Sequence, residues 1–415
     1  MNENSPKKTS TYQYFLFFIC FISGSIGGLT STIVPSYLPT LIKEFTTENV
    51  EGVGAIVNAV FIYGMLFGGI LLGLISDRWG RKMSYLSAVF SIGVFMLLSA
   101  FVNTWMWLVL FRFMTGFGVG GILLITAVII SEEWNEQTKS IALGILSISF
   151  PVGIFSAGII TYNVSNWRTA FFAGILPLII GLLIYFFMKE SRKWLEGKIQ
   201  NKIQPSAIND REMFRVILSG SLIYGSMLIG LWAVFAWLPT WVQTIVVDSD
   251  GQQERGISMM IFASGGLLGG FLSGWICNYF GIKKVMLWCF AGAFLISLIL
   301  FKFTTSLTVF TYFCMAIIAL CFGVSQGVLN GYIPDLFPTP IRSTSTGICF
   351  NISRLFTATV VFFVGWLVQS LNGYGNALFY FSFIFIIGFI VVFFQKRKER
   401  DTIIYEEHLL PLNEQ

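Results

Sequence analysis

Residues 64–82 read GMLFGGILLGLISDRWGRK, a series of glycines that runs into a short charged turn. Residues 265–283 read GGLLGGFLSGWICNYFGIK and repeat the glycine series at a constant offset, about half a chain further on. The matched glycines are Gly64, Gly68, Gly69 and Gly73 in the first copy and Gly265, Gly269, Gly270 and Gly274 in the second. Both copies lie in strongly apolar surroundings. The duplication within apolar sequence predicts a helical membrane protein built from two related halves. Transporters of this kind move one repeat against the other around a site at their interface.

The composition excludes a soluble domain. Of the 415 residues, 55% are hydrophobic and 11% are charged, whereas soluble domains carry roughly 25% charged residues. Apolar runs of about 20 residues recur along the chain, and each can cross a hydrocarbon core of about 30 Å. The centres of twelve such runs lie near Phe21, Leu66, Ile92, Leu123, Ser149, Ile180, Gly230, Gly266, Ala293, Ala319, Thr357 and Ile386. The sequence therefore predicts an all-α integral membrane protein with twelve transmembrane helices.

Basic residues are concentrated in alternate loops. One side would carry Lys7, Lys8, Arg78, Arg81, Lys82, Lys139, the basic residues from Lys189 to Arg215, Lys283, Lys284, Arg342 and residues 396–398. The other side has little beyond Lys43, Arg168 and Arg255. The positive-inside rule then predicts a multi-pass protein of the plasma (inner) membrane with both termini in the cytoplasm. The net charge of +5 reflects this topology and gives no reason to expect a nucleic-acid partner.

The longest polar interruption divides the twelve spans into six and six. It contains Lys, Glu, Gln, Asn and a Pro with little apolar periodicity, as a linker does. The predicted organisation is a cytoplasmic N-terminal tail (1–11), a six-helix bundle (12–188), a cytoplasmic central loop (189–214), a second six-helix bundle (215–395) and a cytoplasmic C-terminal tail (396–415).

Neither a metal site nor a catalytic centre is expected. The six cysteines all fall inside apolar spans and none has CxxC spacing, so neither disulfides nor thiolate metal ligands are predicted. The one histidine, His408, lies in the C-terminal tail. An enzyme needs a converging nucleophile, acid or metal, and no P-loop is present for ATP. We therefore expect neither a cofactor nor an enzymatic activity.

The charged turn of the first copy carries a family signature. Residues 73–82, GLISDRWGRK, resemble the loop G-x-x-x-D-R-x-G-R-[RK] of the major facilitator superfamily. The resemblance implies two pseudo-symmetric six-helix bundles that work by alternating access. It also implies a conformational gating motif, formed here by Gly73, Asp77, Arg78, Gly80, Arg81 and Lys82. In such a motif Asp77 and Arg81 would belong to a charge network that joins the two halves when the cytoplasmic side is shut.

Further stretches resemble particular branches of that superfamily. Residues 112–121, RFMTGFGVGG, are similar to the R-x-x-x-G-x-G pattern of the sugar, organic-ion and aromatic-acid branches. Span five reads FPVG at 150–153, without the Gly-Pro pair that is usual in drug/proton antiporters. The first span has no acidic residue between Gly24 and Val34, where aromatic-acid/proton symporters commonly carry an Asp.

Ionisable residues inside the spans are few and basic. Arg112 lies in span four and Arg354 in span eleven, whereas no Asp or Glu lies in any span interior. Intramembrane charges usually face a cavity or a partner, and the planar fork of Arg binds both oxygens of a carboxylate. The candidate substrate-binding residues are Arg112, Arg354, Asn351, Gln326, Asn330 and Asn58. The alternatives are that Arg112 braces helices by bonding backbone carbonyls and that the amides join helices.

These features predict a secondary transporter that moves a small organic anion, expected to be a carboxylate, across a lipid bilayer. The resemblance implies proton symport, with Glu132 and Asp335 as candidate coupling residues, and it implies a monomer. The alternatives are a facilitator or symporter of a neutral sugar-like substrate, and a sensor with a transporter fold.

Overall fold

The computed structural model describes residues 10–45, 50–134, 138–191, 194–195, 210–246, 250–337 and 342–395. In this part of the chain the regular structure is helical, and twelve segments are long and apolar enough to cross a membrane. All twelve predicted span centres fall inside these segments, which confirms the predicted all-α fold class. The C-terminal tail, most of the N-terminal tail and most of the predicted central loop lie outside the described residues.

Six spans come from the first half of the chain. Their helices are α1 (Thr11–Phe45), α2 (Val50–Trp79), α3 (Arg81–Ser99), α4 (Trp105–Glu133), α5 (Lys139–Ser147) with α6 (Ser149–Asn163), and α7 (Trp167–Phe171) with η1 (Phe172–Gly174) and α8 (Ile175–Phe187). The fifth span is divided at Ile148. Pro151 lies three residues after that break, and a proline has no backbone N–H to continue the helical hydrogen bonds of the preceding turn.

The second half supplies the other six spans. Their helices are α10 (Asp210–Ile245), α11 (Gln252–Phe280), α12 (Ile282–Leu298) with η2 (Ile299–Phe303), α13 (Val309–Asp335), α14 (Arg342–Phe362) with α15 (Val364–Ser370), and α16 (Tyr374–Ser382) with α17 (Ile384–Phe394). Helix α10 begins within the segment 189–214 that was predicted as the central loop.

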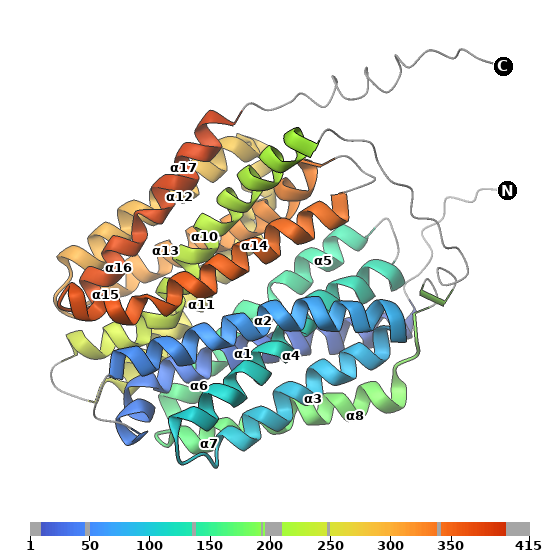
Figure 1. Ribbon diagram of the computed structural model, residues 1–415, viewed down its shortest axis with the longest axis horizontal. Helices are drawn as coiled ribbons and strands as arrows, with labels where there is room; N and C mark the ends of the chain where they lie inside the picture. The colour runs from blue at the N-terminus through green and yellow to red at the C-terminus, as the bar shows by residue number, and fades with distance from the viewer. Residues whose placement is uncertain are drawn as a thin grey trace.

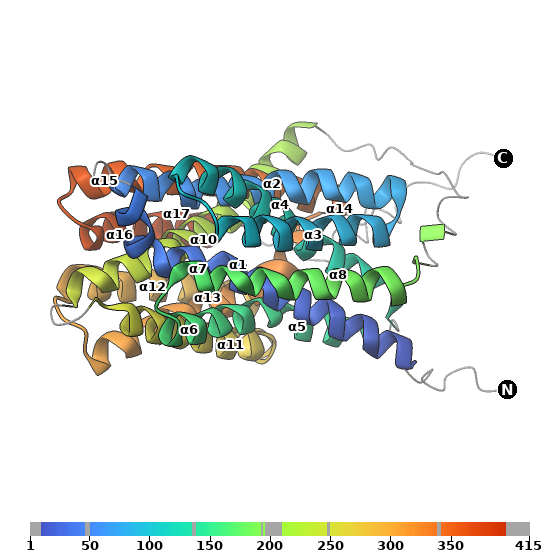
Figure 2. The same cartoon turned by 90° about the horizontal axis from the view of Figure 1, so that it is seen from below.

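The helices form two bundles that lie side by side. In Figure 1 the bundle of α1–α8, in blue to green, lies below the bundle of α10–α17, in yellow-green to red. Figure 2 shows most of the helices running along the long axis. Helix α1 begins and helix α17 ends at the same end of the bundles. We call this the terminal end, where α1 begins and α17 ends. We call the opposite one the far end, where α1 and α6 end and α11 begins.

The repeated glycines set the packing inside each bundle. A Cβ at Gly64 or Gly68 would overlap the backbone carbonyls of α4, at Phe113 and Phe117. Gly265 and Gly269 approach the backbone of α13 in the same way. Small residues allow such close contact between membrane helices. The two copies of the repeat therefore pack α2 on α4 and α11 on α13 alike.

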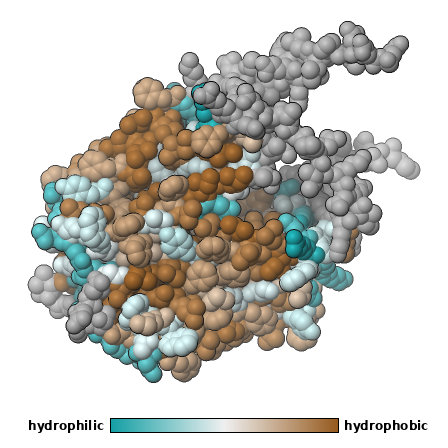
Figure 3. All heavy atoms as spheres, in the orientation of Figure 1, coloured by the Kyte–Doolittle hydropathy of each residue, from teal (hydrophilic) through white to brown (hydrophobic). Residues whose placement is uncertain are grey.

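The lateral surface is apolar. Figure 3 shows hydrophobic side chains across the middle of one face, with hydrophilic residues toward its two ends. Large side chains such as Phe186, Phe271 and Trp366 are between 60% and 70% exposed. An apolar surface of this extent is unfavourable in water, whereas it matches the hydrocarbon core of a bilayer. The protein is a multi-pass integral membrane protein.

Candidate functional site

The two bundles are tightly joined at the far end. Gly158 on α6 lies against Gly256 on α11, so closely that a Cβ on either residue would stand 2.8 Å from the other's carbonyl oxygen. The side-chain amide of Gln252, on α11, donates to the carbonyl oxygen of Thr161 on α6 at 2.8 Å. On the other flank, a Cβ at Gly365 of α15 would stand 2.6 Å from the carbonyl oxygen of Glu51 on α2. The path between the bundles is closed at this end.

Toward the terminal end the bundles separate. Figure 1 shows their ribbons drawing apart in this direction. A Cβ at Gly144 on α5, Gly274 on α11, Gly331 on α13 or Gly347 on α14 would meet no atom within 4 Å. These four helices come from both bundles, and the open space beside them agrees with a path that opens toward the terminal end.

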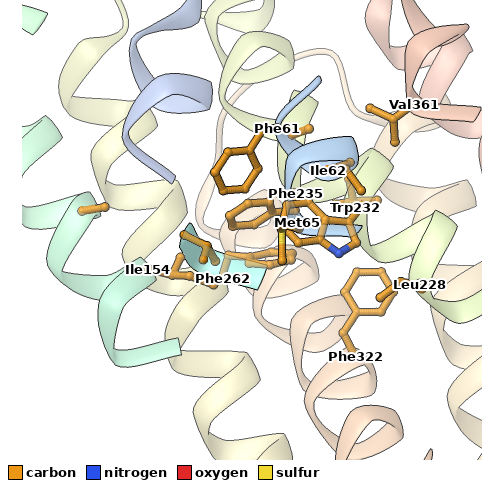
Figure 4. Packing of buried hydrophobic residues seen from close by; sticks show 14 of the residues in the cluster. Phe61, Ile62, Met65, Ile154, Leu228, Trp232, Phe235, Phe262, Phe322 and Val361 are labelled. Atoms are coloured by element: carbon orange, nitrogen blue, oxygen red, sulfur yellow. The ribbon is translucent and has the colours of Figure 1, made fainter. Parts of the chain in front are cut away.

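An aromatic cluster fills the centre between the bundles. It consists of Phe61 on α2, Trp232 and Phe235 on α10, Phe262 on α11 and Phe322 on α13. Neighbouring ring centroids in this series lie between 5.2 and 6.4 Å apart. Figure 4 shows Phe61 and Met65 of α2 beside Trp232 and Phe235 of the other bundle. The cluster is a large apolar surface at the point where the two halves meet.

Arg112 lies on the far-end side of this cluster. Its guanidinium carbon is 4.0 Å from the centroid of the Phe61 ring, and its Nη1 donates to the carbonyl oxygen of Thr30 at 3.0 Å. The side chain is 2% exposed, and its Nε finds no hydrogen-bond partner in the described part of the chain. Arg112 thus makes the carbonyl bond expected of a brace, yet no carboxylate among the described residues forms an ion pair with it.

Arg354 lies at a different depth. It is half-buried on α14, and its Nη1 would stand 3.3 Å from a Cβ at Gly69 on α2 of the other bundle. Across the ranges that the structure describes, neither a hydrogen bond nor an ion pair is found for its guanidinium. Phe61 and Gly69 are eight residues apart on α2, which is about 12 Å along a helix. Arg354 is therefore on the terminal-end side of the aromatic cluster.

The predicted amide side chains also lie on both sides of the aromatic cluster. Asn58 lies one turn of α2 from Phe61, toward the far end, and is 3% exposed. Neither of its side-chain polar atoms has a partner in the described chain. Gln326 lies one turn of α13 beyond Phe322, toward the terminal end, and its buried Nε2 lacks a described partner too. Asn351 is half-buried and Asn330 is exposed, also on that side. The six predicted residues form two layers, not one site.

Trp237 is a polar group that the sequence did not single out. It is fully buried on α10, and no described residue accepts a hydrogen bond from its indole N–H. Its ring edge would stand 3.2 Å from a Cβ at Gly54, on α2 of the other bundle. In the sequence Trp237 resembles any packing tryptophan, and only the orphaned N–H distinguishes it.

The gating motif lies at the terminal end of the first bundle. Arg81 Nη2 is 2.7 Å from Glu132 and Arg81 Nη1 is 2.8 Å from Asp77. Glu190, which follows α8, accepts the backbone N–H of Arg81 at 2.7 Å. All these partners belong to the same bundle. With the terminal end open, Arg81 holds α2, α3 and α4 together within the first half.

The other predicted motif residues have separate roles. Gly73 packs tightly, since its Cβ would stand 2.9 Å from Leu124, and Gly80 adopts a φ of 105°. Lys82 Nζ donates to the carbonyl oxygen of Tyr185 at 2.8 Å, while Arg78 is exposed. The coupling candidate Glu132 is engaged by Arg81, and the second candidate, Asp335, is exposed at the end of α13. In the part of the chain described, no group of three or more His, Cys, Asp or Glu comes together as a metal site would require.

The chain is similar to known membrane transporters. The sequence profile described as Major Facilitator Superfamily matches residues 16–358 and, in a second match, residues 249–410. The chain is 25% identical over 383 residues to the 4-hydroxybenzoate transporter of Pseudomonas aeruginosa, covering 83% of this chain and 84% of that one. It is 22% identical over 414 residues to the cis,cis-muconate transport protein of Acinetobacter baylyi, covering 96% and 98%.

Solved structures agree on the fold. The xylose transporter of E. coli, in a partially occluded inward-open conformation, superposes with a TM-score of 0.77 at 15% sequence identity. The match covers 94% of this chain and 99% of that one. Two bundles of six spans, the duplicated glycine series and the charged turn after α2 agree with the profile match over most of the sequence. The chain belongs to the Major Facilitator Superfamily of membrane transporters.

Proposed function

We propose that this transporter carries a small organic anion with a carboxylate group, preferably one with a planar unsaturated or aromatic body. The observation that carries the proposal is Arg354, a half-buried guanidinium at the bundle interface without a counter-ion among the described residues. A carboxylate can accept two parallel hydrogen bonds from such a group. An anionic substrate would therefore neutralise a charge that the described residues leave uncompensated.

The aromatic cluster supports the shape of the proposed substrate. Phe61, Trp232, Phe235 and Phe262 present ring faces and edges near the interface, and rings prefer offset or edge-on contact with another planar group. The named substrates of the two relatives, 4-hydroxybenzoate and cis,cis-muconate, are both planar unsaturated carboxylates. A neutral sugar-like substrate is the second candidate, because Asn58 and Gln326 keep unpaired buried amide atoms that suit hydroxyl groups.

The proposed topology places the terminal end in the cytoplasm. The loops at this end carry most of the lysines and arginines, including Arg78 and Lys283, as the positive-inside rule requires. The open terminal end is then the cytoplasmic opening, and the structure corresponds to an inward-facing state. Alternating access requires a second state in which the far end is open.

Proton coupling is proposed through Glu132. Its carboxylate pairs with Arg81 at 2.7 Å at the terminal end. A proton on Glu132 would remove this ion pair and free Arg81 for another partner as the cytoplasmic side shuts. Asp335, at the same end of the second bundle, is the other candidate for the titrating group.

The test is uptake of radiolabelled carboxylates into proteoliposomes. We expect Arg354→Gln to lower 4-hydroxybenzoate uptake at least about tenfold, since a hydrogen bond to a charged group contributes about 1.5–3 kcal/mol. Arg354→Lys should retain part of the activity because it keeps the charge. Arg215→Gln, the loss of an exposed arginine on α10, is the matched control. Uptake unchanged in Arg354→Gln contradicts the proposal, and uptake of neutral sugars alone favours the second candidate.

A further inference from the structure

Three buried side chains with orphaned polar atoms lie on the far-end side of the aromatic cluster. They are Arg112 on α4, Asn58 on α2 and Trp237 on α10, and we call them the far layer. Each is at least 97% buried. Each also has a side-chain nitrogen, and Asn58 an oxygen as well, for which no partner exists among the described residues.

One face of α2 brings the far layer together. Gly54, Asn58 and Phe61 are spaced at i, i+4 and i+7, which places them on one side of a helix. The Trp237 ring lies against Gly54, and the Arg112 guanidinium lies over Phe61. Asn58 is between these two contacts. Because Trp237 comes from the second bundle, the far layer spans the interface between the bundles.

These groups are costly where they are. A buried donor or acceptor without a partner has lost its hydrogen bonds to water and gained none in return, and buried polar atoms without partners are uncommon in native proteins. Ser36 and Thr240, at the same end of α1 and α10, add two more orphaned hydroxyl oxygens. A concentration of such groups on one side of the cluster points to a ligand that is bound there in another state of the protein.

The chemistry of the far layer selects an acceptor-rich ligand. A guanidinium, an indole N–H and an amide NH₂ are all hydrogen-bond donors, and the Arg112 charge has no counter-ion in the described chain. A carboxylate satisfies donors of this kind and neutralises the charge. The amide oxygen of Asn58 remains available for a hydroxyl substituent.

We propose that the far layer is a second carboxylate site, which the substrate occupies when the far end is open. This inference rests on the proposed function, and it assigns substrate binding to two separate sites. Arg354 lies about 12 Å further along the path, by the eight residues from Phe61 to Gly69 at 1.5 Å each, so one carboxylate cannot touch both layers. The substrate binds at the far layer, passes the contact of Phe61 with Trp232, and binds again at Arg354.

The test measures KM separately from the two faces of proteoliposomes that contain the full chain in one orientation, with radiolabelled benzoate and cis,cis-muconate as probes. The variants are Asn58→Leu and Trp237→Phe, which remove polar atoms and keep most of the side-chain volume. We expect KM at the far-end face to rise about tenfold in each, as for a lost hydrogen bond to a charged group, while KM at the terminal-end face stays within about twofold. Arg354→Gln should show the reverse asymmetry.

The control is Trp241→Phe, the same change one turn further along α10, where the ring packs on Phe301. It should leave both KM values within about twofold of wild type. If Asn58→Leu and Trp237→Phe both melt no lower than wild type and leave KM at the far-end face unchanged, the far layer is not a binding site, although the proposed function stands. If the wild type takes up neither probe from either face, the proposed function fails and this inference fails with it.

Discussion

The side-chain amide of Gln252 donates a hydrogen bond to the carbonyl oxygen of Thr161, with 2.8 Å between the two atoms. The same amide donates to the carbonyl oxygen of Val164 at 2.8 Å. The last carbonyls of a helix have no partner within it, so a residue of the second bundle caps α6 of the first. These bonds exist only while the far end is shut, and they must break when it opens.

Replacing Gln252 should therefore favour the open far end. With the two hydrogen bonds contributing about 1 kcal/mol each, Gln252→Leu should raise the population open at the far end by about thirtyfold. The measurement is the rate at which an impermeant thiol reagent, added at the far-end face, labels a cysteine placed at the buried Thr240. Gln253→Leu, a change at the exposed neighbouring residue, is the control. Equal rates in the two variants would show that the Gln252 cap does not hold the far end shut.

Gly256 should tolerate no side chain. A Cβ there would stand 2.8 Å from the backbone nitrogen of Tyr162 and from the carbonyl oxygen of Gly158, and backbone cannot give way as a side chain can. Gly256→Ala should keep the far end from closing and reduce uptake more than about tenfold, since overpacking costs about 1–3 kcal/mol. Gly274→Ala, on the same helix with no atom within 4 Å of its Cβ, should retain near wild-type uptake. Full uptake in Gly256→Ala would mean that the two backbones need not approach so closely.

Some features of this molecule follow from local pattern. The twelve spans were predictable, because apolar length is a property of single segments. The packing of α2 on α4 was not predicted, because glycine spacing indicates a close contact but not the helix that makes it. The fold class and the membership of the superfamily were predicted and are confirmed. The break at Ile148 also has a local cause in Pro151, although the sequence was interpreted as one continuous span.

The arrangement of the site was not available from such patterns. Arg112 and Arg354 were predicted together as substrate-binding residues, and they separate because α4 and α14 place them on opposite sides of one aromatic cluster. Gln252 reaches a carbonyl that lies 91 residues earlier in the chain, and no local signal marks that partner. Trp237 differs from other buried tryptophans by the absence of an acceptor among the described residues, which is a property of packing.

Gly80 and its counterpart Gly281 should respond differently to the same change. Both have a positive φ, 105° and 85°, which is strained for any residue with a Cβ. A Cβ at Gly80 would also displace the Glu190 carboxylate that caps α3, whereas a Cβ at Gly281 meets no atom within 4 Å. Gly281→Ala should cost about 1–3 kcal/mol from backbone strain alone, and Gly80→Ala should cost more. Thermal unfolding in detergent compares them, and equal losses would mean that the Glu190 cap adds nothing.

Asn58→Leu should stabilise the protein even though it impairs binding. The substitution removes two buried polar atoms that have no described partner, each costing roughly 1–3 kcal/mol. We expect Tm to rise by about 2 °C or more without substrate. Asn163→Leu, at an exposed position on α6, should leave Tm unchanged. A fall in Tm for Asn58→Leu would show that the Asn58 amide already has a stabilising partner.

The two bundles should rock against each other, so that the far end opens as the terminal end closes. Spin labels at Trp79 and Tyr279, exposed ends of α2 and α11, report the terminal end, and labels at Asn163 and Gln253 report the far end. The most direct test is to measure the distance within each pair of labels by pulsed electron paramagnetic resonance, with and without a transported carboxylate. We predict that the carboxylate adds a population with a shorter distance between the labels of the first pair. It should also add a population with a longer distance between the labels of the second pair. Distances that stay fixed at both ends in protein that transports would contradict this rocking motion.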